Sequence, residues 1–319
     1  MRFFLLILLV FISFLSCKKK SSNQVHISKI DISFSVDRFE VDFYKSSADR
    51  LSEIKEKYPL LFPVETPDSI WIQKIKDKEE QELFTETQKI YHDFSDIKKE
   101  LTALFKHIKF YNKDFQAPNV ITVLSNIDYE NRVIYTGDLL FISLDVYLGN
   151  EHRFYSDYPS YIRINNTKNH IVVDVASQII EKQFPSNEER TFISKIIYEG
   201  KKWYVREIYL PDQPEEEKLG YSKEKLDWAI ENEEQIWKYF IENGLLYSTD
   251  SQLNKRFLEK APFSKFYLEQ DNLSPGNIGA WIGLQIVQSY MKNNDVSLQE
   301  LLSKSTSEIF KKSKYKPKK

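Results

Sequence analysis

Cysteine and glycine are both scarce in this sequence. A single cysteine in 319 residues excludes an internal disulfide and a zinc site built from cysteine pairs. Only eight glycines are present, and neither the phosphate-binding pattern G-x-x-x-x-G-K nor the dinucleotide-binding pattern G-x-G-x-x-G occurs. The G-x-S-x-G elbow that presents a nucleophilic serine is also missing. The sequence therefore excludes disulfide scaffolds and many common nucleotide-binding enzymes, and no serine stands out as a nucleophile.

A surplus of charge of either sign is absent as well. The 45 lysines and arginines nearly balance the 47 aspartates and glutamates, which gives a formal net charge of −2. Nucleic-acid-binding proteins usually carry a basic excess or stripe, so this balance argues against a nucleic-acid partner. Hydrophobic residues make up 41% of the chain and aromatic residues 14%, which is enough to build a folded core.

The N-terminus has the three parts of a secretory signal peptide. Arg2 supplies the positive charge, residues 3–12 are apolar, and the small residue Ser16 precedes the only cysteine, Cys17. The apolar run is shorter than the 20 or so residues that a membrane-spanning helix needs. We therefore expect residues 1–16 to be a signal peptide and residues 17–24 to be a tether.

The run Phe14-Leu15-Ser16-Cys17 resembles the lipobox of bacterial lipoproteins, in the version found in Bacteroidetes. The resemblance implies that a diacylglyceryl group is attached to the sulfur of Cys17 and that the chain is cleaved before it. Two or three acyl chains form a durable membrane anchor. Lys18–Lys20 follow in place of the acidic residues that usually signal surface export, which favours the periplasmic face of the outer membrane. The alternative is an uncleaved anchor helix.

Hydrophobic periodicity predicts an α+β fold, with a small β-sheet flanked by several helices and a helical C-terminal half. Strands are expected within residues 25–43 and at residues 119–124, 133–136 and 139–148. Helices are expected over residues 49–58, 66–91, 94–111, 169–183, 187–209, 222–243 and 277–293.

The connecting segments carry further expectations. Gly244 is typical of a helix C-cap, and Pro211–Lys218 reads as an exposed acidic loop. Gly279 and Gly283 lie four residues apart on one helix, which favours a close approach to another backbone of the same chain. We assign residues 25–310 to one domain and residues 311–319, which contain six lysines, to a basic tail.

One helix carries the best candidates for a metal or catalytic site. His170 and Asp174 are four residues apart and share a helical face. Zinc peptidases use His-Glu-x-x-His at this spacing, with the glutamate as general base, but Ile171 stands at that position here. Glu199, 25 residues beyond Asp174, is placed like the third zinc ligand of many peptidases. A degenerate metal site formed by these residues is one interpretation.

A solvated surface is the competing interpretation. His170, Asp174, Ser177, Gln178 and Glu181 form one polar stripe, and an amphipathic surface helix accounts for all of them without a metal. Because a general base is missing, we expect no catalytic residue, no bound metal or other cofactor, and no enzymatic activity.

Several long stretches resemble the gliding motility lipoprotein family GldB of the Bacteroidetes. Besides the lipobox, the resemblance rests on the following runs: Arg38-Phe39-Glu40, Lys57-Tyr58-Pro59 with Leu61-Phe62-Pro63, Ile197-Tyr198-Glu199-Gly200-Lys201-Lys202-Trp203-Tyr204, Trp237-Lys238-Tyr239-Phe240-Ile241, Leu246-Tyr247-Ser248, Ala261-Pro262-Phe263-Ser264-Lys265-Phe266-Tyr267, Ser274-Pro275-Gly276 and Gly279-Ala280-Trp281-Ile282-Gly283. It covers essentially the whole chain that remains after signal cleavage.

The GldB resemblance implies a function. The family is similar to a zincin-like group of predicted metallopeptidases, so the expected fold is zincin-like. The leading hypothesis is a lipid-anchored periplasmic component required for gliding motility. It would support the type IX secretion and gliding machinery as a non-catalytic pseudo-peptidase scaffold that binds other envelope proteins, through an apolar groove near Ser177 and Trp281. The alternatives are a metal-dependent hydrolase with a degenerate zinc site and a lipoprotein that binds a small envelope ligand. The oligomeric state stays open.

Overall fold

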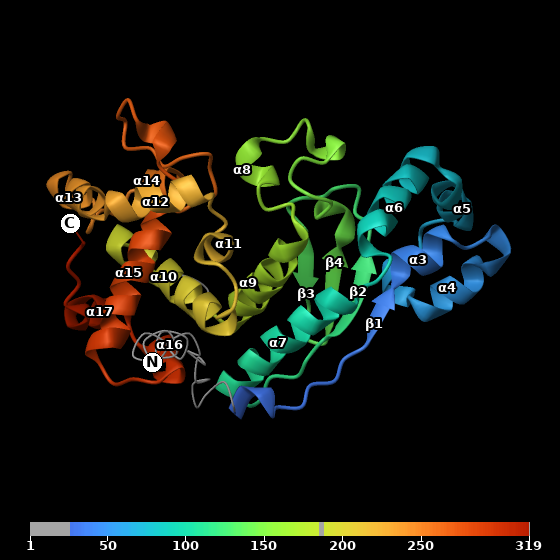
Figure 1. Ribbon diagram of the computed structural model, residues 1–319, viewed down its shortest axis with the longest axis horizontal. Helices are drawn as coiled ribbons and strands as arrows, with labels where there is room; N and C mark the ends of the chain where they lie inside the picture. Colours follow the sequence, from blue (N-terminus) through green and yellow to red (C-terminus); the bar gives the residue numbers. More distant parts are fainter. Residues whose placement is uncertain (1–25, 185–187, 319) are drawn as a thin grey trace, which may run out of the picture.

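A small mixed β-sheet lies at the centre of the fold. The computed structural model describes residues 26–184 and 188–318, so the predicted signal peptide, Cys17 and the tether lie outside the described residues. The strands are β1 Val36–Arg38, β2 Asn119–Val123, β3 Val133–Tyr135 and β4 Leu139–Ser143. Their order is β1-β2-β4-β3, with β1 and β4 parallel to β2 and β3 antiparallel to β4 at the edge (Figure 1). The predicted α+β class is confirmed.

Four helices near the N-terminus build a small core of their own beside β1. They are α3 Phe39–Tyr44, α4 Leu51–Lys57, α5 Asp68–Lys76 and α6 Lys78–Tyr91. Aromatic and aliphatic side chains fill the space between them: Phe43, Tyr44, Leu51, Ile54, Tyr58, Phe62, Ile75 and Phe84. Figure 1 shows these helices as a group at one end of the molecule, on the side of the sheet away from the C-terminal helices.

Two long helices join the sheet to the rest of the main core. Helix α7 Ser95–Tyr111 lies across the sheet, and α9 Ile171–Gln183 lies between the sheet and the C-terminal helices (Figure 1). Helix α9 is apolar over most of its surface and buries seven side chains: Ile171, Val172, Val173, Val175, Ala176, Ile179 and Ile180. One stripe of α9 is left for polar residues, and this stripe faces the C-terminal half.

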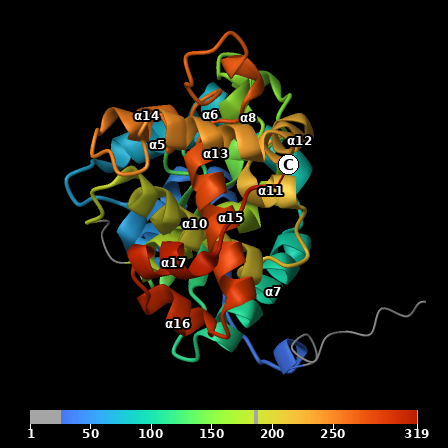
Figure 2. The same cartoon turned by 90° about the vertical axis from the view of Figure 1, so that its left-hand side faces the viewer.

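The C-terminal half consists of helices and the loops between them, with no strand among its described residues. Its helices are α8 Ser160–Arg163, α10 Phe192–Tyr209, α11 Glu215–Leu219, α12 Lys223–Glu231, α13 Glu233–Glu242, α14 Gln252–Phe257, α15 Ile278–Asn293, α16 Leu298–Ser303 and α17 Thr306–Ser313. Figure 2 looks onto this group, in which α15 runs beside both α10 and α17. Within residues 26–184 and 188–318, no helix has both the length and the apolar character that crossing a bilayer requires.

Helices α10 and α15 touch through their backbones. A Cβ atom added to Gly283 would lie 1.7 Å from the carbonyl oxygen of Ile196, and one added to Gly200 would lie 2.1 Å from the carbonyl carbon of Gly283. No side chain fits at either position, so both glycines are required for the crossing. The expected close packing of Gly279 and Gly283 within the chain is confirmed, since a Cβ atom added to Gly279 would also lie close to another backbone, 2.9 Å from the carbonyl oxygen of Phe257.

The expectation of strands across residues 25–43 is wrong except at Val36–Arg38. Ile32 and Phe34 pack against the main core without lying in a strand, so their alternation reflects one-sided burial, whereas Val36 belongs to β1 and pairs with β2. The next residues form α3, in which Phe39 and Phe43 stack at the four-residue spacing of a helix, with ring centroids 5.2 Å apart.

Two predicted long helices are each broken once. The helix expected over residues 66–91 is divided at Asp77, whose carboxylate caps α6 by accepting the N–H groups of Glu79 and Glu80. The helix expected over residues 222–243 is divided at Asn232 into α12 and α13. Gly244 has the expected left-handed conformation, with φ of 65°.

The predicted ends of the last strand and of the chain also differ from the structure. The strand expected over residues 139–148 stops at Ser143, because Leu144–Val146 form a 3₁₀ turn. The predicted basic tail begins inside α17, and Tyr315 donates a hydrogen bond to Glu233 at 2.8 Å. Residues 311–315 are therefore held against the helical half.

Replacing Gly283 with alanine tests the helix crossing. We expect Gly283→Ala to lower the free energy of unfolding by about 3 kcal/mol, because the added methyl group has to push α10 away from α15. Chemical unfolding of the purified full-length protein, followed by circular dichroism, measures this loss. Gln285→Ala, two residues further along α15 and only half-buried, is the control and should change stability little. A stability for Gly283→Ala equal to that of the control would contradict the backbone contact.

Candidate functional site

A cavity of about 600 Å³ lies between α9 and the C-terminal helices. Its walls come from α9, α10, the loop that precedes β3, the segment around α8, the link between α11 and α12, the chain that follows α14 and the start of α15. Charged and amide side chains line it together with aromatic and aliphatic ones such as Leu219 and Leu258, so it is a mixed cavity rather than the apolar groove that we expected. Trp281, which we expected at the contact surface, is only 1% exposed and belongs to the core.

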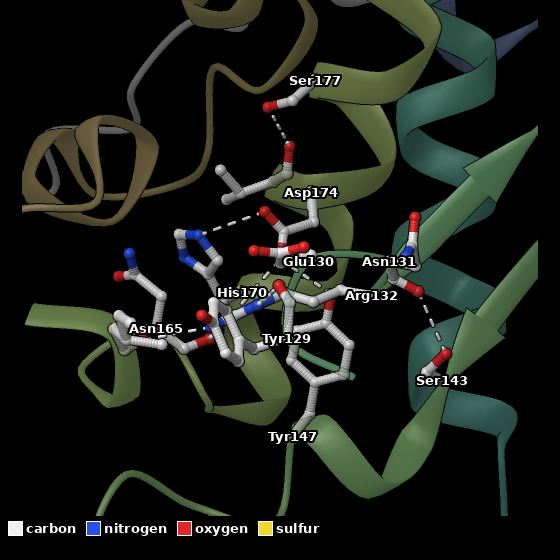
Figure 3. Close-up of polar contacts among 12 residues, drawn as sticks. Tyr129, Glu130, Asn131, Arg132, Ser143, Tyr147, Asn165, His170, Asp174 and Ser177 are labelled. Carbon is white, nitrogen blue, oxygen red and sulfur yellow. Dashed lines mark hydrogen bonds and ion pairs between the residues drawn. The ribbon is translucent and has the colours of Figure 1, made fainter. Parts of the chain in front are cut away.

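His170 lies at the bottom of this cavity, at the end of the 3₁₀ turn that leads into α9. It is 4% exposed, and both of its ring nitrogens face carboxylates, of which Figure 3 shows that of Asp174. Nδ1 lies 2.8 Å from Oε1 of Glu217, and Nε2 lies 3.6 Å from Oδ1 of Asp174. The imidazole therefore connects α9 to α11.

Asp174 sits one helical turn further along α9 and has several partners. The hydroxyl of Tyr147 donates a hydrogen bond to its carboxylate at 2.8 Å, and Nη1 of Arg132 lies 3.8 Å away (Figure 3). Burial alone would raise the pKa of Asp174, but the positive charges of His170, Arg132 and Lys260, together with the Tyr147 hydrogen bond, hold it below its ordinary value. Asp174 is thus a carboxylate kept ionised by the basic groups around it.

Glu199 projects from α10 into the same cavity. Its carboxylate lies 3.3 Å from Nζ of Lys202, and the same ammonium group lies 2.8 Å from Glu181 on α9. Burial raises the pKa of Glu199; the charge of Lys202 opposes this rise and that of Glu181 adds to it. One lysine therefore holds two carboxylates and ties α9 to α10.

The three sequence candidates do not fit a zinc ion. His170, Asp174 and Glu199 line one cavity, but they pair with different side chains. No group of three or more histidine, cysteine, aspartate or glutamate side chains within residues 26–184 and 188–318 is arranged to hold a metal ion. A zinc site needs three or four such groups around one point. The arrangement provides an ion-paired framework rather than a ligand set.

The polar stripe of α9 lies partly inside the protein and partly at its surface. All five of its residues line the cavity: His170, Asp174, Ser177, Gln178 and Glu181. The interpretation of α9 as an amphipathic surface helix is therefore only partly right: His170 is buried and Asp174 and Ser177 are half-buried in the cavity, whereas Gln178 and Glu181 are exposed. The stripe marks a candidate site, even though the residues within it do not form the chemistry of a peptidase.

Sequence reasoning missed the residues that hold the stripe in place. Glu217 belongs to the acidic run that we expected to be an exposed loop, but part of this run folds into α11 and Glu217 binds His170. Arg132 donates hydrogen bonds to the carbonyl oxygens of Tyr129, Ile162 and Asn165, which fixes the loops at the cavity mouth. The acidic run was the only local signal for Glu217, and neither Arg132 nor Tyr147 belongs to a recognisable motif.

The loop before β3 has an unusual backbone that a buried carboxylate maintains. Asn126 and Ile127 both have left-handed conformations, with φ of 58° and 61°, which is rare for a β-branched residue. Asp145, which is fully buried, accepts the N–H groups of Ser125 at 3.0 Å and Ile127 at 2.7 Å. This loop leads directly to Tyr129, which lines the cavity. Asp145 therefore helps to shape the cavity wall.

Comparison with known proteins identifies one family. A family model described as "Gliding motility protein GldB" matches residues 20–317, which is nearly the whole chain. No curated protein and no solved structure gives a significant match.

The pH dependence of stability tests the role of Asp145. Burial raises the pKa of Asp145 to about 6 from an ordinary value of 3.8, although the N–H groups of Ile127 and Ser125 oppose this rise. The folded state thus binds this proton more tightly than the unfolded state does. The resulting stabilisation is complete below about pH 4 and is lost as the pH rises through 6.

We therefore expect the free energy of unfolding of the wild type, relative to that of Asp145→Asn, to increase as the pH is lowered from 7.5 to 5. Urea unfolding of the purified full-length protein at several pH values gives this difference. Asp138→Asn, at an exposed turn beside β4, is the matched control and should follow the wild-type profile. A difference between wild type and Asp145→Asn that does not vary with pH would show that Asp145 does not titrate in this way.

Proposed function

The chain belongs to the gliding motility protein GldB family, and we propose that it is a lipid-anchored, non-catalytic scaffold that binds another envelope protein at its charged cavity. Membership in this family implies involvement in gliding motility. Within the proposal, the lipidated Cys17 holds the folded domain on the periplasmic face of the outer membrane. There the domain supports the gliding and type IX secretion machinery without performing a reaction of its own.

One observation carries the non-catalytic part of the proposal. The residues that occupy the positions of a peptidase site are each engaged in an internal pair: His170 with Glu217, Asp174 with Arg132, and Glu199 with Lys202. A metal-dependent peptidase needs free ligands around an open metal position and a nearby general base. Ile171, which stands at the position of the base, cannot accept a proton. These pairs instead stabilise the cavity walls, as a binding protein requires.

The cavity also suits a binding role in its size and composition. Ligand sites are typically concave and about 300–1,000 Å³ in volume, with a few well-placed polar groups among apolar and aromatic side chains. The cavity here has about 600 Å³, with Tyr129, Tyr161 and Trp203 among its lining residues. Its rigid elements, α9 and α10, are fixed by the ion pairs described above.

The lipid anchor can be tested through Cys17. In gliding host cells whose own copy is deleted, we expect Cys17→Ala to shift the protein from the outer-membrane fraction to the soluble periplasmic fraction and to abolish gliding, because no other acyl attachment site is available. Cell fractionation and time-lapse microscopy measure these effects. Ser22→Ala, in the same tether, should behave as the wild type does. Normal gliding with a soluble Cys17→Ala protein would show that the anchor is dispensable.

Metal content and motility test the non-catalytic role. We expect the purified full-length protein to carry far less than one zinc ion per chain, and cells with Glu199→Gln to glide at the wild-type speed. Glu188→Gln, at an exposed position before α10, is the matched control for a lost carboxylate. One zinc ion per chain in the wild type, lost in Glu199→Gln together with gliding, would overturn the scaffold and establish a metal-dependent hydrolase.

A further inference from the structure

Positive charge is in excess around Asp174. Arg132 lies 3.8 Å from its carboxylate, and both Arg206 and Lys260 lie within electrostatic range of it. His170 also faces Asp174, but it shares its charge with Glu217. Three permanent cations therefore lie around Asp174, although Glu130, Glu181 and Glu199 also line this cavity.

Arg206 lies near several carboxylates but forms no ion pair with any described residue. It lines the cavity from α10, and its guanidinium lies 5.3 Å from the ring centre of Trp203. Nη1 donates a hydrogen bond to the carbonyl oxygen of Lys218 at 2.7 Å, but no carboxylate lies within 4.0 Å of the guanidinium among the described residues. Burial lowers the pKa of Arg206, although Asp174, Glu181 and Glu199 act at longer range against this. Arg206 is half-buried, and a partly buried cation without an ion pair is stabilised by an incoming anion.

Two lysines continue the same wall toward the cavity mouth. Lys225, on α12, donates hydrogen bonds from Nζ to the carbonyl oxygens of Asn272 and Ser274. Lys260, just after α14, is exposed and has no hydrogen bond or ion pair within the described part of the chain. The wall formed by Arg206, Lys225 and Lys260 therefore has donors that are free to bind a ligand.

The acidic residues that line the cavity determine which kind of anion it can bind. Glu181 and Glu199 share the single ammonium group of Lys202, and they act on Arg206 only at longer range. However, Glu199 and Glu130 line the same cavity and would repel a doubly charged phosphate more strongly than a singly charged carboxylate.

Amide and aromatic groups cover the rest of the cavity. Asn165 and Gln178 line it with side-chain amides that have no hydrogen-bond partner among residues 26–184 and 188–318. Such groups can both donate to and accept from the N–H and C=O groups of a peptide. Tyr129 and Tyr161 provide flat surfaces for side chains. The lining thus matches a polypeptide with a carboxylate better than it matches an isolated ion.

We propose that the cavity binds an acidic peptide segment of the partner protein, with one carboxylate seated between Arg206 and Lys260. This proposal rests on the function proposed above and names the chemistry of the partner at that site. The carboxylate supplies the ion pair that Arg206 lacks, and the amides of Asn165 and Gln178 bind the peptide backbone.

Fluorescence anisotropy with labelled peptides tests this directly. The purified full-length protein in detergent is titrated into a pool of fluorescein-labelled hexapeptides with two glutamates at varied positions and amidated C-termini. A second pool has glutamines at the same positions. We expect the glutamate pool to bind about tenfold more tightly than the glutamine pool, and more weakly as salt increases.

Variants assign the binding to the cavity. Lys260→Glu should weaken binding of the glutamate pool at least about tenfold, because it replaces an attraction by a repulsion without disturbing a buried contact. Lys265→Glu is the matched control, since Lys265 is exposed on the same segment but does not line the cavity. Arg206→Gln should also weaken binding, and Arg206→Lys should restore part of it.

Three outcomes would overturn the proposal: equal binding of both pools, equal effects of Lys260→Glu and Lys265→Glu, or binding of inorganic phosphate with no binding of the glutamate pool. The last would mean that the cavity takes a phosphate group instead. These failures leave the scaffold function itself intact, because anchoring, motility and zinc content are measured separately in cells and on the purified protein.

Discussion

The crossing of α10 and α15 at Gly200 and Gly283 is the contact on which the geometry of the cavity depends. Because the two backbones touch there, α10 has a single rotational setting relative to the C-terminal helices. That setting turns Glu199 and Arg206, which lie on the neighbouring face of α10, toward the polar stripe of α9. A side chain at either glycine would push the helices apart and displace the wall that carries Arg206. Packing of small residues thus controls the placement of charged ones.

Ion pairs then hold α9, α10 and α11 in the positions that the helix packing gives them. Lys202 holds Glu181 and Glu199 across α9 and α10, and His170 joins α9 to Glu217 on α11. Partly buried charges require partners, and these partners come from within the chain for every group that would serve a peptidase. Arg206 and Lys260 are left without a carboxylate among the described residues. These two unpaired cations are the groups to which we assign recognition of a charged ligand.

Much of the fold could be predicted from the sequence, because helix and strand periods are local properties. The strands after residue 119 and the long helices α7, α9, α10 and α15 follow their hydrophobic patterns. The breaks at Asp77 and Asn232 were missed because the apolar pattern continues through them. Ile32 and Phe34 alternate with polar residues because one side of this segment packs on the core. A strand with one buried face has the same alternation, so the pattern could not distinguish the two.

The candidate site was only partly predictable, for a different reason. His170 and Asp174 are four residues apart, so their common face could be derived, and Glu199 was placed in the right helix. Their partners come from segments far away in sequence, such as Glu217 and Arg132, and no local pattern marks them. Helix α10 lies beside the α9 stripe in a position that depends on its crossing with α15. This tertiary contact cannot be derived from the hydrophobic pattern of α9 alone.

Site-specific photocrosslinking in gliding cells tests most directly whether the charged cavity is where this family member holds its partner. A photoreactive amino acid is placed at Gln178 inside the cavity, or at the exposed Gln73 on α5 as a control. We predict that position 178 crosslinks to one envelope protein through an acidic segment, that Lys260→Glu abolishes this crosslink, and that position 73 does not form it. The same crosslink from both positions, or one that persists in Lys260→Glu, would contradict a role for the cavity in partner binding.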